Sequence, residues 1–187
     1  MLNKSLSITF LLLLLIHFME TLTTPAYSII SNHVFAERRQ KLSNKQNALF
    51  ATQSFQPGEV IADFSAGTIA AAPTYLTVQV GIEKHITLQP EFLQYINHSC
   101  DPNVFFNTTT MQLVALKEVG PEEEMTFFYP STEWKMTQSF KCYCGSHDCL
   151  GKIQGAAFLP KEARENYRFT DFIQEQLARR SARKKVA

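Results

Sequence analysis

Residues 97–103 read NHSCDPN, and they contain Cys100, the first of four cysteines in the chain. The other three lie close together in the stretch CYCGSHDC, residues 142–149. A tight turn in this stretch brings its three sulfurs together, and Gly145 gives the backbone the freedom to wrap around an ion. The fourth sulfur then comes from far upstream. The pattern therefore predicts a metal site that joins residues 97–103 to the C-terminal part of the chain.

The number and spacing of the cysteines favour zinc. A structural zinc ion binds four soft ligands in a tetrahedron, at about 2.3 Å from each sulfur. Two disulfides are the alternative, but Cys142 and Cys144 are too close in sequence to pair well with each other, so both would need other partners. His98 and His147 offer substitute ligands that a complete set of cysteines makes unnecessary. We expect one structural Zn²⁺ ion with these ligands: Cys100, Cys142, Cys144 and Cys149.

From Ile29 onward the sequence pattern is rich in short strands. Residues 47–52, followed by 55–61, predict a strand, a turn and a second strand, with Pro57-Gly58 as the turn signal. Further strands are expected at residues 75–80, 85–88, 104–107, 112–115 and 124–129. Their close spacing, with Gly, Pro and Asn between them, predicts a mainly β fold of several short antiparallel sheets.

The two ends of the chain differ from this middle part. Residues 161–180 place apolar side chains near helical spacing, which predicts a C-terminal helix packed on the body. At the N-terminus, residues 5–19 carry no formal charge and include the apolar run 11–16. This run is short for a membrane span but suits a signal-peptide core, with a small-x-small cleavage pattern at residues 26–28. A signal peptide, an uncleaved anchor and an unused upstream start all stay open, and we exclude residues 1–28 from the fold.

Length and charge set the remaining limits. The chain of 187 residues has room for one compact domain with short appendages. Its 45% hydrophobic and 19% charged residues are ordinary for a chain that buries a core. The formal net charge of +1 indicates no particular partner, although basic residues gather in the tail from Arg179 to Lys185.

Three motifs, taken together, resemble those of SET-domain lysine methyltransferases. NHSCDPN matches the NHSCxPN motif of this family, and residues 120–129, GPEEEMTFFY, are similar to its GEELTxxY motif. Residues 142–151 resemble its post-SET element, and the order of the motifs is the family's order. With residues 49–51 and 57–61 the likeness covers residues 46–155. The Gly-x-Gly pair that the family usually shows before Leu-Phe-Ala is replaced here by Gln46-Asn47-Ala48.

The resemblance implies a β-clip, or SET, fold with a pseudoknot. In this arrangement the segment after Cys100 threads under a loop, and Asn97 and His98 lie beside the strand of Tyr129. Cys100 then becomes the remote fourth zinc ligand, and the zinc ion holds the post-SET turn over the cofactor. We expect these parts along the chain: a signal-like leader at 1–28, the SET domain at 29–135, the post-SET zinc element at 136–156, and a C-terminal helix with a basic tail at 157–187.

The implied reaction is the methylation of a protein lysine with S-adenosylmethionine as the donor. Methyl transfer from a sulfonium to an amine is an in-line displacement without a covalent enzyme intermediate, so positioning and desolvation supply most of the rate. The lysine amine must arrive neutral, although its ordinary pKa is about 10.4. An apolar channel next to a cationic sulfonium lowers that pKa, because burial and like charge both disfavour the ammonium.

The resemblance also implies roles for individual residues. Tyr129 is the expected catalytic tyrosine, and Phe127 occupies the position that influences how many methyl groups are added. Because a phenyl ring there holds no hydrogen-bonded water, we hypothesise di- or trimethylation. We expect the cofactor to be bound by the following residues: Ala48, Leu49, Phe50, Gln94, Tyr95, Asn97, His98, Tyr129 and Leu150. At His98 the contact is expected from the backbone.

Three other readings stay open at this stage. The first is an inactive SET-like module that binds a peptide or the cofactor, the second a zinc-ribbon-like nucleic-acid binder, and the third a secreted disulfide-stapled protein. We expect a protein substrate that presents a lysine, histone or not, and no specific nucleic acid. The location is expected to be cytoplasmic or nuclear if the leader is not a working signal, and exported or membrane-anchored otherwise. A membrane is expected to be met only through an uncleaved leader, and the sequence leaves the oligomeric state open.

Overall fold

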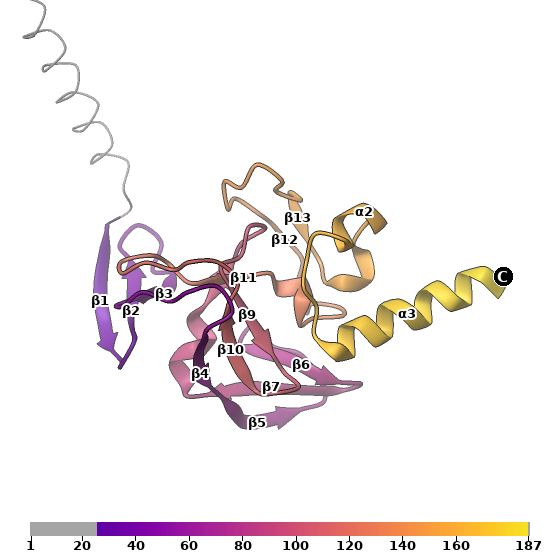
Figure 1. Cartoon of the computed structure of the whole chain (residues 1–187), viewed down its shortest axis with the longest axis horizontal. Coiled ribbons are helices and arrows are strands. Elements are labelled where there is room, and N and C mark those ends of the chain that lie inside the picture. The colour runs from indigo at the N-terminus through magenta and orange to yellow at the C-terminus, as the bar shows by residue number, and fades with distance from the viewer. Residues whose placement is uncertain (1–25, 187) are drawn as a thin grey trace, which may run out of the picture.

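The computed structural model describes residues 26–186, and most of its regular elements are short strands (Figure 1). The strands are β1 (Tyr27–Asn32), β2 (Ala36–Lys41), β3 (Asn47–Ala51), β4 (Val60–Asp63), β5 (Ser65–Ala70), β6 (Thr77–Gly81), β7 (Lys84–Gln89), β8 (Asn97–His98), β9 (Val104–Asn107), β10 (Gln112–Ala115), β11 (Thr126–Phe127), β12 (Phe140–Lys141) and β13 (Lys152–Ile153). The helical elements are the 3₁₀ turns η1 (Glu91–Tyr95), η2 (Tyr129–Ser131) and η3 (Ala156–Phe158) and the α-helices α2 (Lys161–Arg164) and α3 (Asp171–Val186).

These strands form several small sheets, as the sequence predicts. Three antiparallel sheets have the strand orders β1-β2-β3, β4-β10-β9 and β5-β7-β6, and β12 pairs with β13. Strands β9 and β10 have the predicted bounds, whereas β11 covers only Thr126–Phe127 of the expected 124–129. The strand ends there because Tyr129 enters a 3₁₀ turn with Pro130, which has no N–H to donate to a ladder. The expectation of a mainly β fold with several short antiparallel sheets is confirmed.

One pairing differs from the antiparallel expectation, because β8 and β11 run parallel. In this pair Asn97 is opposite Thr126 and His98 is opposite Phe127. The backbone N–H of Ser99 continues the ladder by donating to the carbonyl of Phe127 at 3.1 Å. The intervening chain passes through β9 and β10 before it returns in the same direction, which is what a parallel pair requires. The expected placement of Asn97 and His98 beside the Tyr129 segment is therefore confirmed.

Asn103, the last residue of NHSCDPN, fixes this crossing. Its side-chain amide donates to the Glu123 carboxylate at 3.0 Å and to the backbone carbonyl of Glu124 at 2.9 Å. Its amide oxygen accepts the N–H of Thr126 at 2.7 Å. Because Asn103 is buried, these bonds satisfy polar groups that have little access to water.

The main hydrophobic core lies between the three-stranded sheets and is rich in aromatic residues. Phe64 and Phe127 meet the ring of Phe106 edge to face, with centroids 5.5 and 4.8 Å away. Phe106 and Leu113, on neighbouring strands β9 and β10, are fully buried. Burial of such side chains contributes about 1.5–3 kcal/mol each relative to exposure. The β8–β11 crossing thus packs against this buried core.

The expected C-terminal helix is confirmed, but the stretch 161–180 is divided between α2 and α3. Helix α2 ends at Arg164, and α3 begins at Asp171. Tyr167 and Phe169 lie in the non-helical link between them, and the Tyr167 ring stacks on Phe128 at 3.6 Å. Only the predicted bounds were wrong, because the Tyr167 and Phe169 rings both pack against Phe128 from the link between the helices.

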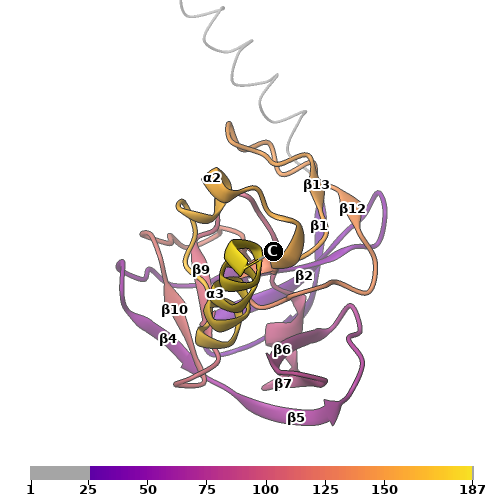
Figure 2. The same ribbon diagram turned by 90° about the vertical axis from the view of Figure 1, so that its right-hand side faces the viewer.

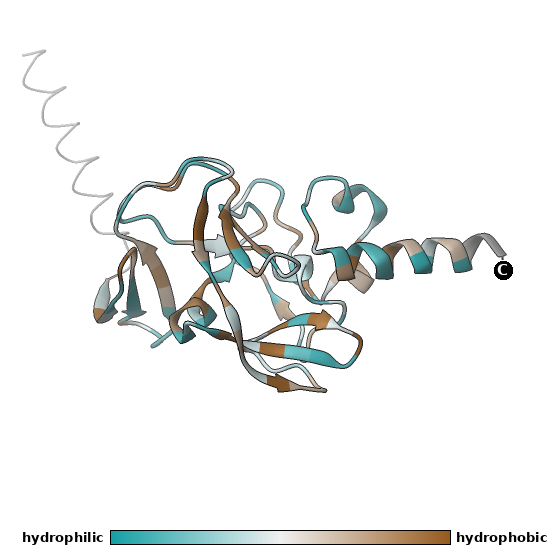
Figure 3. Ribbon diagram, turned by 60° about the horizontal axis from the view of Figure 1, so that its bottom comes forward, coloured by the Kyte–Doolittle hydropathy of each residue, from teal (hydrophilic) through white to brown (hydrophobic). Residues whose placement is uncertain are grey.

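Helix α3 leaves the body after its first turns. Ile173 is buried, whereas Arg179 and Arg183 are exposed. Figure 2 views this helix nearly end on, and Figure 3 shows hydrophilic residues recurring along it beyond the body. Within residues 26–186, no helix is both long and apolar enough to cross a membrane.

At the N-terminus the fold begins two residues before the expected boundary at 29. Strand β1 starts at Tyr27, and its register places Tyr27 opposite Lys41 of β2. The Tyr27 ring meets the Phe50 ring edge to face at 5.0 Å. The leader expected at 1–28 otherwise lies outside the described residues. Tyr27 and Ser28 therefore belong to the folded body.

Candidate functional site

The four cysteines come together as the sequence predicts. Their sulfur atoms all lie within 4.8 Å of one another, and the sulfurs of Cys100 and Cys142 are 4.0 Å apart. All four are free thiols, which disagrees with the disulfide alternative. Sulfurs bound to one zinc ion in a tetrahedron are about 3.8 Å apart, given bonds of about 2.3 Å. The cluster therefore fits a four-thiolate zinc ion.

Backbone donors around the cluster also favour thiolates. The N–H of Cys100 points at the sulfur of Cys144 at 3.4 Å, and the N–H of Leu150 points at the sulfur of Cys100 at 3.5 Å. Burial opposes ionisation at Cys144, but hydrogen bonds from the backbone of Cys100 and Ser146 prevail and lower its pKa to about 6. Burial raises the pKa of Cys100 and of Cys142, the latter to about 11. A cation is what allows such a buried set to ionise together.

A polar cavity of about 570 Å³ lies beside the cysteine cluster. Its walls come from the β1-β2-β3 sheet, from the β8–β11 crossing and from the cysteine segment. The lining residues are Tyr27, Lys41, Asn44, Gln46, Ala48, Asn97, His98, Glu124, Tyr129, Phe140, Lys141, Cys142, Tyr143 and Cys144. The cavity contains two lysines, Lys41 and Lys141, and one carboxylate, Glu124, so it can bind groups of either charge. Its amide side chains can form hydrogen bonds, and its aromatic rings can stack on a flat ring.

Asn97 has its side chain fully engaged in this cavity. Its amide nitrogen donates to the carbonyl of Asn47 at 2.9 Å and to the Glu124 carboxylate at 2.8 Å. Its amide oxygen faces the side-chain nitrogen of Gln46 at 3.3 Å. Burial raises the pKa of Glu124, and the hydrogen bond from Asn97 opposes that rise. The first residue of NHSCDPN thus joins three segments that are distant in sequence.

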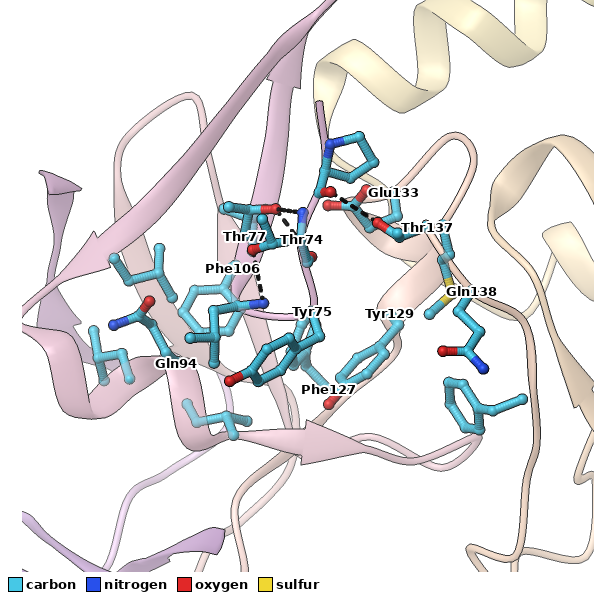
Figure 4. Close-up of a pocket in the computed structure, with 18 residues that line it drawn as sticks. Thr74, Tyr75, Thr77, Gln94, Phe106, Phe127, Tyr129, Glu133, Thr137 and Gln138 are labelled. Atoms are coloured by element: carbon cyan, nitrogen blue, oxygen red, sulfur yellow. Dashed lines mark hydrogen bonds between the residues drawn. The ribbon is translucent and has the colours of Figure 1, made fainter. Parts of the chain in front are cut away.

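A second cavity, of about 580 Å³, lies on the other side of Tyr129 and is mostly apolar (Figure 4). It is lined by residues 73–78 around β6, by the η1 region and by the segment that follows β11. These residues line it: Pro73, Thr74, Tyr75, Leu76, Thr77, Val78, Leu88, Leu93, Gln94, Ile96, Phe106, Phe127, Tyr129, Glu133, Met136, Thr137, Gln138 and Phe140.

Tyr129 and Phe140 line both cavities and thus form their common wall. Burial, together with the charge of Glu124, raises the pKa of Tyr129 to about 12, so its hydroxyl keeps its proton at neutral pH. Its ring lies 4.7 Å from that of Phe127 and 6.0 Å from that of Phe140. A protonated phenol thus stands where a polar cavity and an apolar one meet.

His98 links this wall to the cysteine cluster through its imidazole. One ring nitrogen, Nδ1, accepts the backbone N–H of Tyr129 at 3.3 Å, and Nε2 lies 3.4 Å from the sulfur of Cys100. Burial lowers the pKa of His98 to about 4, which leaves a neutral ring at pH 7. The imidazole therefore supports the Tyr129 segment, while the residue itself also lines the polar cavity.

The predicted cofactor residues fall into two groups. The polar cavity contains four of them: Ala48, Asn97, His98 and Tyr129. The others lie elsewhere. Leu49 and Phe50 are buried beside it in β3, and Leu150 packs against the cysteine cluster. Gln94 lines the apolar cavity, and Tyr95 carries the guanidinium of Arg38 over its ring at 3.7 Å.

Sequence reasoning missed several residues of the polar cavity, among them Tyr27, Lys41, Glu124 and Phe140. Glu124 and Phe140 had a usable signal, since one belongs to a recognised motif and the other lies two residues before Cys142. Tyr27 and Lys41 had none, because they are brought to the cavity by the pairing of β1 with β2.

Comparison with known proteins agrees with this arrangement. Residues 46–130 match the SET domain model. The chain is 35% identical over 123 residues to Methyltransferase flvH of Aspergillus flavus, a match that covers 65% of this chain and 68% of that protein. It is also 27% identical over 103 residues to the Histone-lysine N-methyltransferase, H3 lysine-36 specific, of Candida glabrata, which covers 49% of this chain but only 14% of that much longer protein.

Among solved structures, the methyltransferase domain of human Histone-lysine N-methyltransferase SETMAR aligns with 71% of this chain and 59% of that chain. The TM-score is 0.45 and the sequence identity 14%. The family assignment depends on the SET domain match and on Methyltransferase flvH, of which 68% is covered by this chain. The motifs that lie around Tyr129 agree with it. On this evidence the chain belongs to the SET-domain family of methyltransferases.

Proposed function

We propose that this protein transfers a methyl group from S-adenosylmethionine to a lysine side chain of a protein substrate. The observation that carries the proposal is the wall that Tyr129 and Phe140 share between a polar and an apolar cavity. The methyl donor is a charged, nucleotide-like molecule, which suits the polar cavity. The methyl acceptor presents the alkyl chain of a lysine, which suits the apolar cavity. Lysine as the acceptor is supported by the resemblance to histone-lysine methyltransferases.

The polar cavity offers a suitable partner for each part of S-adenosylmethionine. Lys41 and Lys141 suit a carboxylate, Glu124 suits an ammonium, and the Phe140 and Tyr143 rings suit a flat base. When bound, the cofactor supplies an electrophilic methyl group on a sulfonium. We assign the cofactor to this cavity, with Asn97 and the backbone at His98 as its central contacts.

The residues around Tyr129 prepare the acceptor. The apolar cavity removes water from an entering lysine chain, which lowers the pKa of its amine and favours the neutral nucleophile. The Tyr129 hydroxyl, protonated at neutral pH, orients that amine by hydrogen bonding. The Phe127 ring adds no polar group beside it, and this is the basis for proposing di- or trimethylation.

We assign one structural zinc ion to the cysteine cluster. Three of its ligands come from residues 142–149, and residues 140–144 also line the polar cavity. The fourth ligand, Cys100, follows His98 by two residues in the β8 segment. The ion would therefore fasten one wall of the polar cavity to the β8–β11 crossing. In this proposal the SET domain extends to residue 135 and the post-SET element covers 136–156.

An inactive module that binds the cofactor or a peptide is the second candidate. It is favoured by one contact, the hydrogen bond from Gln46 to Asn97, because this side chain stands where the family usually has glycine.

The protein should be assayed from a start at or before Ala26, since Tyr27 belongs to the polar cavity.

The deciding experiment is incubation of the zinc-loaded protein with radiolabelled S-adenosylmethionine and mixed histone or cell-lysate proteins. We expect label in protein, with the label on lysine, and at least about a hundredfold less with Tyr129→Phe. The matched control is Ser181→Ala, which removes an exposed hydroxyl on α3, outside both cavities. Cofactor binding by calorimetry without any label transfer would favour the inactive module.

A further inference from the structure

A single carboxyl group stands in the apolar cavity. Among the described residues that line it, Glu133 alone carries a formal charge. Glu133 follows Tyr129 by one turn, and its backbone N–H donates to the Tyr129 carbonyl at 3.1 Å. The residue is only 6% exposed, and within the part of the chain that the structure describes neither carboxyl oxygen has a hydrogen-bond partner.

The neighbours of Glu133 do not satisfy it. The Nδ1 atom of His85 lies 3.8 Å from carboxyl oxygen Oε2 of Glu133, a separation too long for a hydrogen bond, and that nitrogen is unpaired among the described residues as well. The Gln79 side chain is committed elsewhere, because it accepts from Trp134 at 2.9 Å and donates to the carbonyl of Gly81 at 3.0 Å. The Gln79 backbone faces the carboxyl and opposes the rise in its pKa, but burial prevails. Thr137 donates its hydroxyl to the carbonyl of Pro73. Figure 4 shows Glu133 close to Thr137 on one side of the cavity.

Such a group is costly to the fold. Burying a polar group without a partner costs about 1–3 kcal/mol, and more when the group is charged. Burial accordingly raises the pKa of Glu133 to about 8. Gln or Met would fill the same space without an ionisable group. The position therefore has the properties of a binding site whose partner is a ligand of the cavity.

We propose that Glu133 is a specificity residue that binds a second cationic side chain of the substrate, a lysine or arginine that flanks the methylated lysine. This inference rests on the proposed function, since it takes the apolar cavity as the substrate site. A cation that reaches the carboxyl, whose two oxygens are almost closed to solvent in this structure, supplies the donors that they lack and restores the ionised form. In dry surroundings such a pair is strong. Arginine suits the role best because it bonds both oxygens at once.

The place of Glu133 separates this role from binding of the target amine. The methyl group is to be transferred at the wall formed by Tyr129 and Phe140, which both cavities share. Glu133 lines the apolar cavity only. A target lysine held at Glu133 would be kept from that wall, whereas a flanking residue of the same peptide can reach Glu133 while the target amine meets Tyr129.

The test uses a peptide library with one lysine in a background of Ala, Gly and Ser, and with a single Arg, Ala or Asp placed at each flanking position in turn. Binding is measured by fluorescence anisotropy with S-adenosylhomocysteine present, and methylation of the same peptides is measured separately. The variants are Glu133→Gln, which keeps the shape and removes the charge, and the control Glu91→Gln, at an exposed position outside the cavity.

With the wild-type protein we expect Arg at one or two flanking positions to tighten binding by about ten- to a hundredfold over Ala. Glu133→Gln should abolish this preference and keep the affinity for the Ala peptides, and Glu91→Gln should preserve it. Absence of an Arg preference in the wild-type protein, or its survival in Glu133→Gln, overturns the inference. An equal loss of affinity for every peptide in Glu133→Gln also overturns it, because Glu133 would then act on the target lysine.

The two readouts keep this inference apart from the proposed function. An Arg preference in binding without methylation of any peptide supports the subsite and counts against the enzyme. Methylation without any flanking preference supports the enzyme and overturns the subsite.

Discussion

The side-chain amide of Asn97 donates a hydrogen bond of 2.8 Å to the carboxylate of Glu124, across the parallel pairing of β8 with β11. The two residues belong to the two motifs that identify the family, and both line the polar cavity. Geometry at this bond therefore decides the shape of the proposed cofactor site.

Replacing Asn97 by Asp should damage that site. The change substitutes an acceptor for the donor that faces Glu124 and the carbonyl of Asn47, so repulsion replaces two hydrogen bonds. We expect the free energy of unfolding to fall by about 2 kcal/mol and the affinity for S-adenosylhomocysteine to fall at least about tenfold. Urea unfolding and calorimetry measure the two effects. Asn107→Asp is the control, because Asn107 acts as an acceptor toward Thr109 and keeps that role; an equal effect there would contradict the assignment.

Removing the side chain of Gln46 should have the opposite effect on the cofactor. Gln46→Gly frees the amide oxygen of Asn97 and opens space in the polar cavity. We expect the affinity for S-adenosylhomocysteine to rise by about fivefold, roughly the value of one hydrogen bond. Calorimetry compares it with Gln56→Gly, an exposed turn position away from both cavities. A weaker affinity in Gln46→Gly would show that the Gln46 side chain itself binds the cofactor.

The number of methyl groups added should depend on Phe127. Its ring is buried, lines the apolar cavity and lies 4.7 Å from the Tyr129 ring. In Phe127→Tyr the added hydroxyl can hold a water molecule where a methylated amine has to turn. We expect di- or trimethyl product from the wild-type protein and mostly monomethyl product from the variant, by mass spectrometry. Only monomethyl product from both proteins would refute this role.

Removal of zinc should disturb the cofactor site and leave the core intact. Elemental analysis should find one zinc ion per chain, and chelation should speed hydrogen exchange in residues 140–153 while β9 and β10 stay protected. Cofactor affinity should fall in parallel, because residues 140–144 line the polar cavity. Cys149→Ser should reproduce both effects, whereas Ser146→Ala, which leaves all four thiols in place, should not. Unchanged exchange after complete zinc removal would contradict the proposed role of the ion.

The stability of the protein should depend on pH through Glu133. Burial raises the pKa of the Glu133 carboxyl from its ordinary value of 4.5 to about 8 in the folded protein. Between these values the folded chain holds a proton that the unfolded chain has lost, so rising pH favours unfolding. We expect the melting temperature of the wild-type protein to fall from pH 4.5 to 8 relative to that of Glu133→Gln, and the difference to level off above about pH 8. Parallel curves for the two proteins would show that Glu133 does not titrate in this range.

Much of this architecture could be predicted from sequence because its markers are local. The strands at 104–107 and 112–115 follow directly from runs of apolar residues, and the four cysteines are recognisable by spacing alone. The placement of Asn97 and His98 beside the Tyr129 segment was accessible only through the resemblance, because strands of two residues are too short to show a period. The parallel direction of β8 and β11 was not predicted. The break between α2 and α3 was missed since tertiary contacts of Tyr167 with Phe128 override local spacing.

The candidate site was predictable where a motif covered it. Asn97, Tyr129 and the cysteines lie in recognised stretches, whereas Tyr27 and Lys41 reach the polar cavity through pairing of β1 with β2. Glu133 carried no signal at all. Its meaning depends on burial and on unpaired oxygens, two properties that exist only once the chain has folded.

The wall shared by Tyr129 and Phe140 has a consequence for the chemistry of inhibitors. A molecule that tethers a nucleoside analogue to a lysine-like alkyl arm could occupy both cavities at once, with its linker passing beside the phenol. Tethering makes the second binding event intramolecular, so such a bisubstrate compound should exceed the affinity of either half by about 10²–10⁴ when the linker length fits.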